Sequence, residues 1–384
     1  MAHVVIIGGG FAGVWSAAGA ALARKDADLR VTLIAPNEGL VLRPRLYEPA
    51  LDLAKVALSR ILEPIGVEHI RAAVSTIDTD RHVVVADGVE VGYDRLVLAA
   101  GSQLVAPEGL PGAERLFDID TLDGAGRLYK HLRGRKDFSV LVVGAGFVGL
   151  EVATALADRG RVVLVDRAQV VGEQLGPGPR NEIESALDVL GIACRLGTTV
   201  TEIGEGYAAL SDGTVVEADA VVWSVGMKAS ALTQQVSSQL DHLGRVLVDQ
   251  QLRALPEVFV AGDTAAAAVD AEHMAMQACQ HATPLGKVAG FNAAADLLGV
   301  PLRDFVPGPY VTCLDLGSAG AVFTRGWDRR VMATGAVASK IKKQINDAIH
   351  PPVDDRVAIL AAADLVSFDP PFFSAPERDA QPVA

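Results

Sequence analysis

Two stretches of the chain share one pattern of apolar and polar positions, which predicts a buried strand, a tight turn and a helix. The first begins with the apolar run His3–Ile7 and continues into an alanine-rich segment that ends near Lys25. The second begins with Phe138–Val143 and continues to about Arg159. Short apolar runs of this kind are typical of parallel strands that are buried on both faces. The turn glycines are Gly8, Gly10 and Gly13 in the first copy and Gly144, Gly146 and Gly149 in the second.

Each copy also carries a hairpin and a final apolar strand at matching distances. The hairpin turns are Asp87-Gly88 and Asp212-Gly213, each flanked by valine-rich strands. The final strands end in Gly101 and Gly226, and both lie 13 residues after the turn glycine (88 to 101 and 213 to 226). A lone G-x-G-x-x-G is weak evidence, but two copies in the same context predict two related dinucleotide-binding folds.

The spacing of the turn glycines has a physical reason. The first permits the tight turn, the second lets a pyrophosphate approach the backbone, and the third lets helix and strand pack closely. The N-terminus of the following helix then offers unpaired N–H groups to the phosphates. The alternative is that these glycines serve close packing alone.

Composition and charge exclude several classes of function. The formal charge of −13, from 34 Lys and Arg against 47 Asp and Glu, repels nucleic acid and anionic lipid surfaces. The three cysteines, Cys194, Cys279 and Cys313, form no metal or disulfide spacing, which fits free thiols in a reducing cytoplasm. The apolar N-terminus lacks a basic region, and no apolar run is long enough to span a membrane. We expect a cytoplasmic protein without a metal site or a nucleic-acid partner.

The second copy carries an acid where a bound nucleotide would place its adenosine ribose. Asp166 follows the strand Val162–Val165, 22 residues after Gly144 (144 to 166). A carboxylate at this position receives the ribose hydroxyls and repels a 2′-phosphate, which predicts NADH in preference to NADPH. The adjacent Arg167 leaves NADPH open, because a guanidinium can bind that phosphate.

The first copy lacks this acid and has Ala35-Pro36 at the equivalent position. Asn37 or Glu38 from the next turn could replace it, or backbone and water could hold the ribose. A third segment, Val258–Asp263, predicts a buried strand that completes a flavin site. Asp263 would accept the ribitol hydroxyls of FAD, although a helix N-cap is the alternative. Because this segment follows the second copy, the first domain must be discontinuous.

Together these motifs resemble those of the type II NADH dehydrogenases, flavoproteins with two dinucleotide-binding folds. The resemblance covers about residues 1 to 300 and rests on GGGFAG, GAGFVGLE, VVWSVG and VAGD. It implies FAD in the first fold and NADH in the second. The implied FAD contacts are Gly8, Gly10, Phe11, Ala12, Gly13, the Val74 region, Ala100, Gly101 and Asp263. The implied NADH contacts are Gly144, Gly146, Phe147, Asp166 and Gly226, with Gly149 as the third fingerprint glycine.

Two departures from this family concern the electron acceptor. Quinone-reducing members typically carry A-Q-x-x-x-Q after the Gly-Asp strand, whereas here Gln277 is retained and His281 replaces the second glutamine. We expect Gln277 at the flavin and His281 at the acceptor, where an imidazole with its ordinary pKa of about 6.5 can donate a hydrogen bond and a proton. Packing within the helix is the alternative for His281.

The second departure is the C-terminus, because such members end in amphipathic helices that seat on the membrane. This chain ends in Asp369–Phe373 and a short polar tail. Its basic helix at 340–349 has apolar residues at 341, 345 and 349, which favours a surface helix with one core stripe. We therefore expect no stable membrane insertion.

Candidate catalytic groups are few. No cysteine precedes Cys194, which excludes the dithiol relay of disulfide reductases, and Cys279 has no obvious partner. Glu151, two residues after Gly149, is the best candidate, since the resemblance implies a glutamate near flavin and acceptor. Its alternative is an early-helix carboxylate that the helix dipole favours. Arg43, in a loop with Pro44, Arg45 and Tyr47, is expected to line the flavin unless it is merely solvated.

We predict an α/β protein of two Rossmann-like dinucleotide-binding domains, the second inserted in the first, plus a small C-terminal α+β segment. The expected FAD-binding domain comprises residues 1–108 and 231–305, and the NAD(P)H-binding domain 109–230. Residues 306–384 would cover the flavin or form a homodimer face, with strands over Tyr310–Thr334.

The predicted reaction is hydride transfer from NADH to FAD, followed by electron transfer to a small acceptor such as a quinone. One alternative is a reductase of a ferredoxin- or rubredoxin-like carrier protein that docks on a basic patch. The other is a flavin and NADH redox sensor without turnover. The residues of the expected patch are Arg329, Arg330, Lys340, Lys342 and Lys343.

Overall fold

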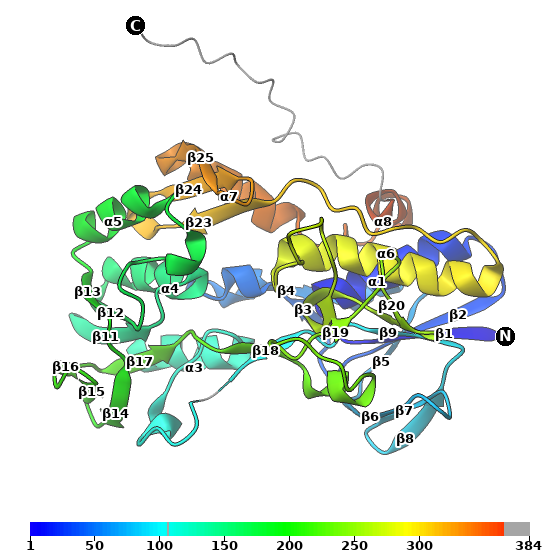
Figure 1. Cartoon of the computed structure of the whole chain (residues 1–384), viewed down its shortest axis with the longest axis horizontal. Helices are drawn as coiled ribbons and strands as arrows, with labels where there is room; N and C mark the ends of the chain where they lie inside the picture. Colours follow the sequence, from blue (N-terminus) through cyan, green and yellow to red (C-terminus); the bar gives the residue numbers. More distant parts are fainter. Residues whose placement is uncertain (106, 365–384) are drawn as a thin grey trace, which may run out of the picture.

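A computed structural model describes residues 1–105 and 107–364, and the tail segment Asp369–Phe373 lies outside these residues. Two sheet-containing halves lie side by side, and a C-terminal layer covers one face of both (Figure 1). The α/β fold with parallel sheets is confirmed.

The first half is built on a six-stranded sheet that contains segments from distant parts of the chain. Its strands are parallel except for β20, which pairs antiparallel with β21. Strands from before and after the second fingerprint thus share one sheet, although the exact domain limits stay a prediction. The strands in spatial order are β20 (Arg253–Leu255), β21 (Val258–Val260), β9 (Arg95–Leu98), β1 (Ala2–Ile7), β2 (Leu29–Ile34) and β5 (Glu68–Ile70).

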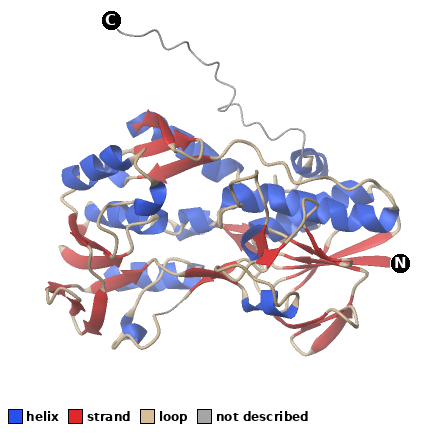
Figure 2. Ribbon diagram, viewed as in Figure 1, coloured by secondary structure: helices blue, strands red, loops and turns tan. Residues whose placement is uncertain are grey.

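Helices α1 (Phe11–Arg24) and α6 (Cys279–Leu298) pack against one another beside this sheet (Figures 1 and 2). Their close approach depends on glycine, since a Cβ on Gly290 would lie 1.9 Å from the Ser16 carbonyl oxygen. The other face of the sheet carries the hairpin sheet of β6 (Val74–Asp78), β7 (Val83–Ala86) and β8 (Val89–Gly92). Smaller elements are β3 (Gly39–Val41), β4 (Lys55–Ala57), α2 (Ser59–Leu62), β19 (Val246–Leu247) and β22 (Ala265–Ala266).

The second half repeats this plan with a four-stranded parallel sheet. Its strands in spatial order are β13 (Ala193–Leu196), β12 (Gly160–Asp166), β11 (Phe138–Val143) and β17 (Ala220–Trp223). Its helices are α3 (Leu122–Leu132), α4 (Phe147–Ala157) and α5 (Arg180–Val189), and its hairpin sheet comprises β14 (Val200–Gly204), β15 (Tyr207–Leu210) and β16 (Val215–Glu217). The antiparallel pair β10 (Ser102–Leu104) and β18 (Met227–Ala229) connects the two halves.

The C-terminal segment contains the expected strands and helix. It consists of β23 (Val311–Asp315), β24 (Ala321–Arg325), β25 (Arg330–Thr334), α7 (Gly335–Ala348) and α8 (Arg356–Ala363). Leu314, Leu316 and Val322 join the core of the second half, so this sheet packs on α4. Helix α8 lies against α1, and no helix within the described residues is long and apolar enough to cross a membrane. A role of this segment in a homodimer stays a prediction.

Candidate functional site

The first fingerprint places its three glycines as a dinucleotide turn requires. Gly8 has a φ of +114°, and a Cβ there would lie 2.2 Å from the Ala99 carbonyl oxygen. A Cβ on Gly13 would lie 1.8 Å from the Gly8 carbonyl oxygen, so helix and strand approach too closely for any side chain. At Gly10, by contrast, a Cβ would meet no described atom within 4 Å. The backbone beside Gly10 is open to a ligand, which fits a diphosphate at the start of α1.

The second fingerprint repeats this geometry. Gly144 has a φ of +107°, and a Cβ on Gly149 would lie 1.8 Å from the Gly144 carbonyl oxygen. The first turn of α4 has no side-chain cap, because its N-cap residue is Gly146. Its N–H groups are therefore available to an anion.

Asp166 ends β12 beside this second turn, as expected for a ribose-binding acid. Its carboxylate accepts hydrogen bonds from the backbone N–H groups of Ala145 (2.6 Å) and Ala168 (2.7 Å). The side chain is thereby fixed next to the fingerprint, whereas Arg167 is exposed. This position favours contact with a ribose, and the contact itself stays a prediction.

In the first half, Arg71 lies over the turn that follows β2. Its guanidinium donates to the Pro36 carbonyl oxygen (3.3 Å) and forms an ion pair with Glu38, in which both side chains are more than half exposed. Glu38, one of the candidates for binding the ribose, is thus already paired at the surface. Its partner Arg71 was not among the residues proposed for this site from the sequence. Ala35 itself is buried.

A network of charged residues surrounds Asp263, which follows β21. Ser102 Oγ donates to the Asp263 carboxylate at 2.5 Å, and Arg43 Nη1 lies 3.6 Å from it. Arg43 also forms an ion pair with Asp120, and Gln277 Nε2 donates to the Asp263 carbonyl oxygen at 3.2 Å. Burial raises the pKa of Asp263, and Arg43 opposes this shift. The structure therefore brings together Arg43, Asp263 and Gln277, three residues that the sequence had predicted separately.

The remaining expected FAD contacts lie around the same edge of the first sheet. Val74 and Ala100 pack against one hydrophobic cluster, and Gly101 follows with a φ of +70°. Ala12 packs so tightly against the Asp263 turn that a Cβ on Gly262 would lie 2.6 Å from its Cβ. Phe11 is buried beside Ala12.

Two further NADH candidates lie in the second half. Phe147, the first residue of α4, packs against the core of this half. Gly226 has a φ of +87° and lines an open pocket of about 530 Å³ beside β18, one of the two strands that join the halves. The other lining residues are Val105, Pro107, Glu108, Trp223, Val225, Met227, Lys228 and Leu243.

Glu151 forms a buried ion pair with a lysine from the C-terminal segment. Lys342 Nζ lies 2.7 Å from Glu151 Oε1, and the backbone N–H of Asp315 also donates to this oxygen at 3.2 Å. Burial raises the pKa of Glu151, and the nearby charge of Lys342 partly opposes this shift. Burial alone would lower the pKa of Lys342, but the attraction of Glu151 outweighs burial, so the pKa of Lys342 is raised. The expectation that Lys342 belongs to a solvated basic patch is wrong, because the side chain is buried against Glu151.

His281 lies in the first turn of α6 with an exposed fraction of only 1%. Its Nδ1 accepts the backbone N–H of Met276 (2.9 Å), and its ring stacks on Tyr310 with centroids 5.6 Å apart. Burial lowers its pKa to about 4, which favours a neutral ring at pH 7 and disfavours the expected proton donation near neutral pH. Because Nδ1 accepts, the proton resides on Nε2, which has no partner among the described residues.

The fold and these two sites define a flavin-dependent oxidoreductase that uses a pyridine nucleotide. The chain belongs to the pyridine nucleotide-disulphide oxidoreductase family, whose model matches residues 2–286. It is 44% identical to an NADH dehydrogenase-like protein of Mycobacterium tuberculosis, over 94% of this chain and 98% of the relative. The type II NADH:quinone oxidoreductase Ndh of the same organism is 30% identical over 69% of this chain and 67% of its own.

Solved structures agree with this fold. A ferredoxin reductase from Rhodopseudomonas palustris superposes with a TM-score of 0.73 at 25% identity, over 84% of this chain and 82% of that one. The sulfide:quinone oxidoreductase of Aquifex aeolicus has a TM-score of 0.75 at 19% identity, covering 94% and 93%, which shows the fold alone. The relation to type II NADH dehydrogenases inferred from the motifs is confirmed. All three cysteines of this chain are free.

Proposed function

We propose that this protein oxidises NADH, rather than NADPH, and passes the electrons to a small acceptor of the quinone type. The buried pair of Glu151 and Lys342 is the observation that carries this proposal. A quinone takes up protons as well as electrons, and reduction by a flavin therefore benefits from a protonatable group held out of bulk water. Glu151 is such a group, and it lies two residues after Gly149, the third fingerprint glycine of the second fold.

Named residues have distinct roles in this proposal. FAD, when bound, supplies the hydride chemistry, and the protein orients it and excludes water. Asp263, with Ser102 and Arg43, would hold the ribitol chain, while the open backbone at Gly10 would receive the diphosphate. Asp166 would accept the ribose hydroxyls of NADH and repel a 2′-phosphate.

His281 would contribute a hydrogen bond rather than a proton. Its lowered pKa favours a neutral ring at pH 7, and its buried Nε2–H has no partner among the described residues. A buried donor without a partner costs free energy, which a carbonyl oxygen of a bound molecule would recover. The proton would come from the ammonium of Lys342, which keeps Glu151 ionised. Glu151 would take this proton through the 2.7 Å hydrogen bond and pass it to the reduced acceptor, and the neutral lysine would then regain a proton from water.

The proposal is tested with the purified protein. Heat should release FAD, and NADH should bleach the flavin in a single-turnover stopped-flow experiment. Steady-state turnover is then measured with a water-soluble quinone, a dye, oxygen and a ferredoxin. Fast flavin reduction with turnover on the quinone supports the proposal, whereas turnover only with the carrier protein contradicts it.

The two alternatives are separated by the same measurements. A carrier-protein reductase would need its basic patch, of which Arg330, Lys340 and Lys343 remain exposed. A redox sensor would show rapid flavin reduction and negligible turnover with every acceptor. The proposal predicts neither pattern.

A further inference from the structure

The Gln174 side chain lies beside the open glycine of the second fingerprint. A Cβ built on Gly146 would lie 3.5 Å from Gln174 Oε1, and it would meet no other described atom within 4 Å. Gln174 belongs to a short 3-10 helix, Glu173–Leu175, in the loop region after β12, and it is exposed. Among the residues that the structure describes, its carboxamide has no hydrogen-bond partner, so it is available to a ligand at this backbone.

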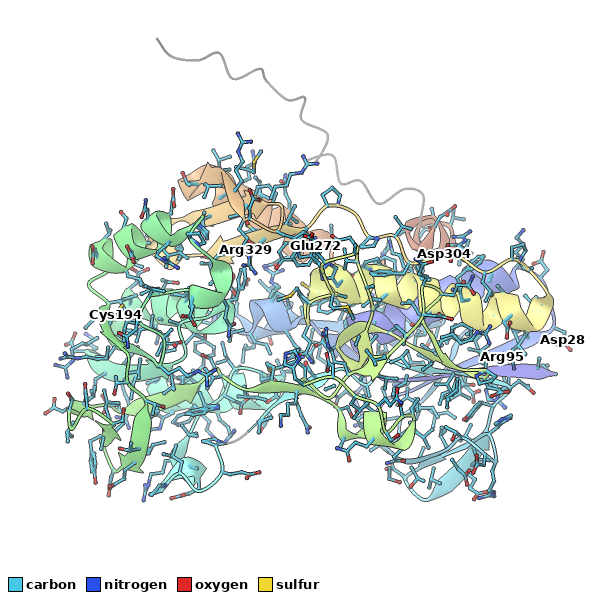
Figure 3. All side chains as sticks on the ribbon, viewed as in Figure 1. Asp28, Arg95, Cys194, Glu272, Asp304 and Arg329 are labelled. Carbon is cyan, nitrogen blue, oxygen red and sulfur yellow. The ribbon has the colours of Figure 1, made fainter. Side chains whose placement is uncertain are left out.

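Arg329, from the turn between β24 and β25, holds the Gln174 backbone. Its Nη1 donates to the Gln174 carbonyl oxygen at 2.6 Å. The same turn approaches the loop closely, because a Cβ on Gly178 would lie 2.3 Å from the Arg329 carbonyl oxygen. Figure 3 labels Arg329 where the C-terminal sheet meets the NADH half. The C-terminal segment thus fixes the loop that carries Gln174.

The turn itself is held by stacked aromatic rings. Trp327 stacks on His273 and on Tyr310, with centroids 4.2 Å apart in both pairs. Arg329 Nη2 also donates to the Tyr310 hydroxyl at 3.3 Å. His273 and Tyr310 come from segments outside the second fold, so Arg329 is also held by residues that do not belong to the loop that it contacts.

Arg329 also carries a charge that no acid within the described residues neutralises. No described carboxylate lies within 4.0 Å of its guanidinium, although the chain carries 47 acidic residues. This unneutralised cation binds the backbone of the residue whose side chain lies beside the uncapped N-terminus of α4, and a positive charge in that region suits a dianionic diphosphate.

We propose that Gln174 binds the diphosphate of NADH and that Arg329 is its positioning residue. The carboxamide can turn by 180°, so its NH₂ group can face the phosphate oxygens while the Gln174 backbone stays fixed by Arg329. The C-terminal segment thereby completes the NADH site of the preceding fold. This inference rests on the proposed binding of NADH to the second fold.

The test uses the FAD-loaded protein and ADP-ribose, which carries the diphosphate but cannot transfer hydride. Binding of ADP-ribose is measured by isothermal titration calorimetry. Adenosine, which lacks both phosphates, is measured as a competitive inhibitor of flavin reduction by NADH. Gln174→Ala should raise the Kd of ADP-ribose about tenfold, as expected for a hydrogen bond to a charged group, and leave the Ki of adenosine within about twofold.

Arg329 is tested with a matched neighbour. Arg329→Ala should weaken ADP-ribose about threefold or more, Arg329→Lys should recover part of this loss, and Arg330→Ala should have no effect. Flavin content, read from the visible absorbance, checks that each variant folds. The inference is overturned if Gln174→Ala binds ADP-ribose as tightly as the parent does. It is also overturned if this variant loses affinity for adenosine by the same factor as for ADP-ribose. Equal losses of ADP-ribose affinity in Arg329→Ala and Arg330→Ala would show that Arg329 has no positioning role. A parent protein that does not bind ADP-ribose would overturn the proposed NADH site itself.

Discussion

Breaking the buried pair of Glu151 and Lys342 should affect stability and the second half-reaction together. Their exposed fractions are 6% and 8%, and their charged atoms lie 2.7 Å apart. Removing one partner leaves an uncompensated buried charge, which costs about 3–5 kcal/mol, whereas removing both is often nearly neutral. Glu151→Leu and Lys342→Met should each lower the free energy of unfolding by about this amount. The double variant should lose less than the sum by about 2 kcal/mol or more.

The measurement is a double-mutant cycle in urea, followed by stopped-flow kinetics of Glu151→Gln. Glutamine still accepts a hydrogen bond from Lys342, so this variant should fold and keep flavin reduction by NADH within about twofold, while oxidation by a quinone slows about tenfold or more. Additive losses in the cycle would show that the pair is not coupled. Equal slowing of both half-reactions would reduce Glu151 to a structural role.

Three further predictions follow from the geometry of single residues. Asp166→Ala should raise the NADPH-to-NADH ratio of kcat/KM about tenfold, and an unchanged ratio would contradict the assignment. His281 has a folded pKa lowered from 6.5 to about 4, so its stabilising effect is present above pH 6.5 and is lost as the pH falls towards 4. Wild-type protein should therefore lose about 3 kcal/mol more than His281→Gln between pH 7 and pH 4 in urea unfolding. Gly13→Ala should prevent stable folding, since its Cβ would lie 1.8 Å from the Gly8 carbonyl oxygen, whereas Gly10→Ala should fold but bind FAD weakly, as heat-released flavin would report.

Local pattern was enough to predict the elements that hold the nucleotides. Both strand–glycine–helix units form as expected, because the close approach of helix and strand is encoded within a few consecutive residues. The hairpin at Asp87-Gly88 also follows from local sequence, since both residues have positive φ (+46° and +83°), as a two-residue turn requires.

Contacts between distant segments were not predictable in this way. Lys342 is 191 residues from Glu151 in the sequence. The buried residues of its helix are Ala338, Lys342 and Asn346, which lie next to the apolar positions 341, 345 and 349 that the pattern indicated. A lysine is buried where an acid compensates its charge, and the sequence near Lys342 does not indicate that Glu151 is this acid. Arg71 was missed for the same reason, because its partners Pro36 and Glu38 lie in a loop with no periodic pattern.

The C-terminal segment brings two cations to the second half, one onto Glu151 of helix α4 and one onto the backbone of Gln174, and they differ in a way that bears on function. Lys342 is neutralised by Glu151, whereas Arg329 has no carboxylate within 4.0 Å among the described residues. The N-terminus of a helix already carries a partial positive charge, so an additional cation in its neighbourhood raises the energy of the protein while no anion is bound. A dianionic diphosphate at Gly146 would offset both the partial charge of the helix N-terminus and the charge of Arg329. Because exposed charges are screened by salt, the binding of ADP-ribose should weaken as ionic strength rises, and Arg329→Ala should reduce that dependence.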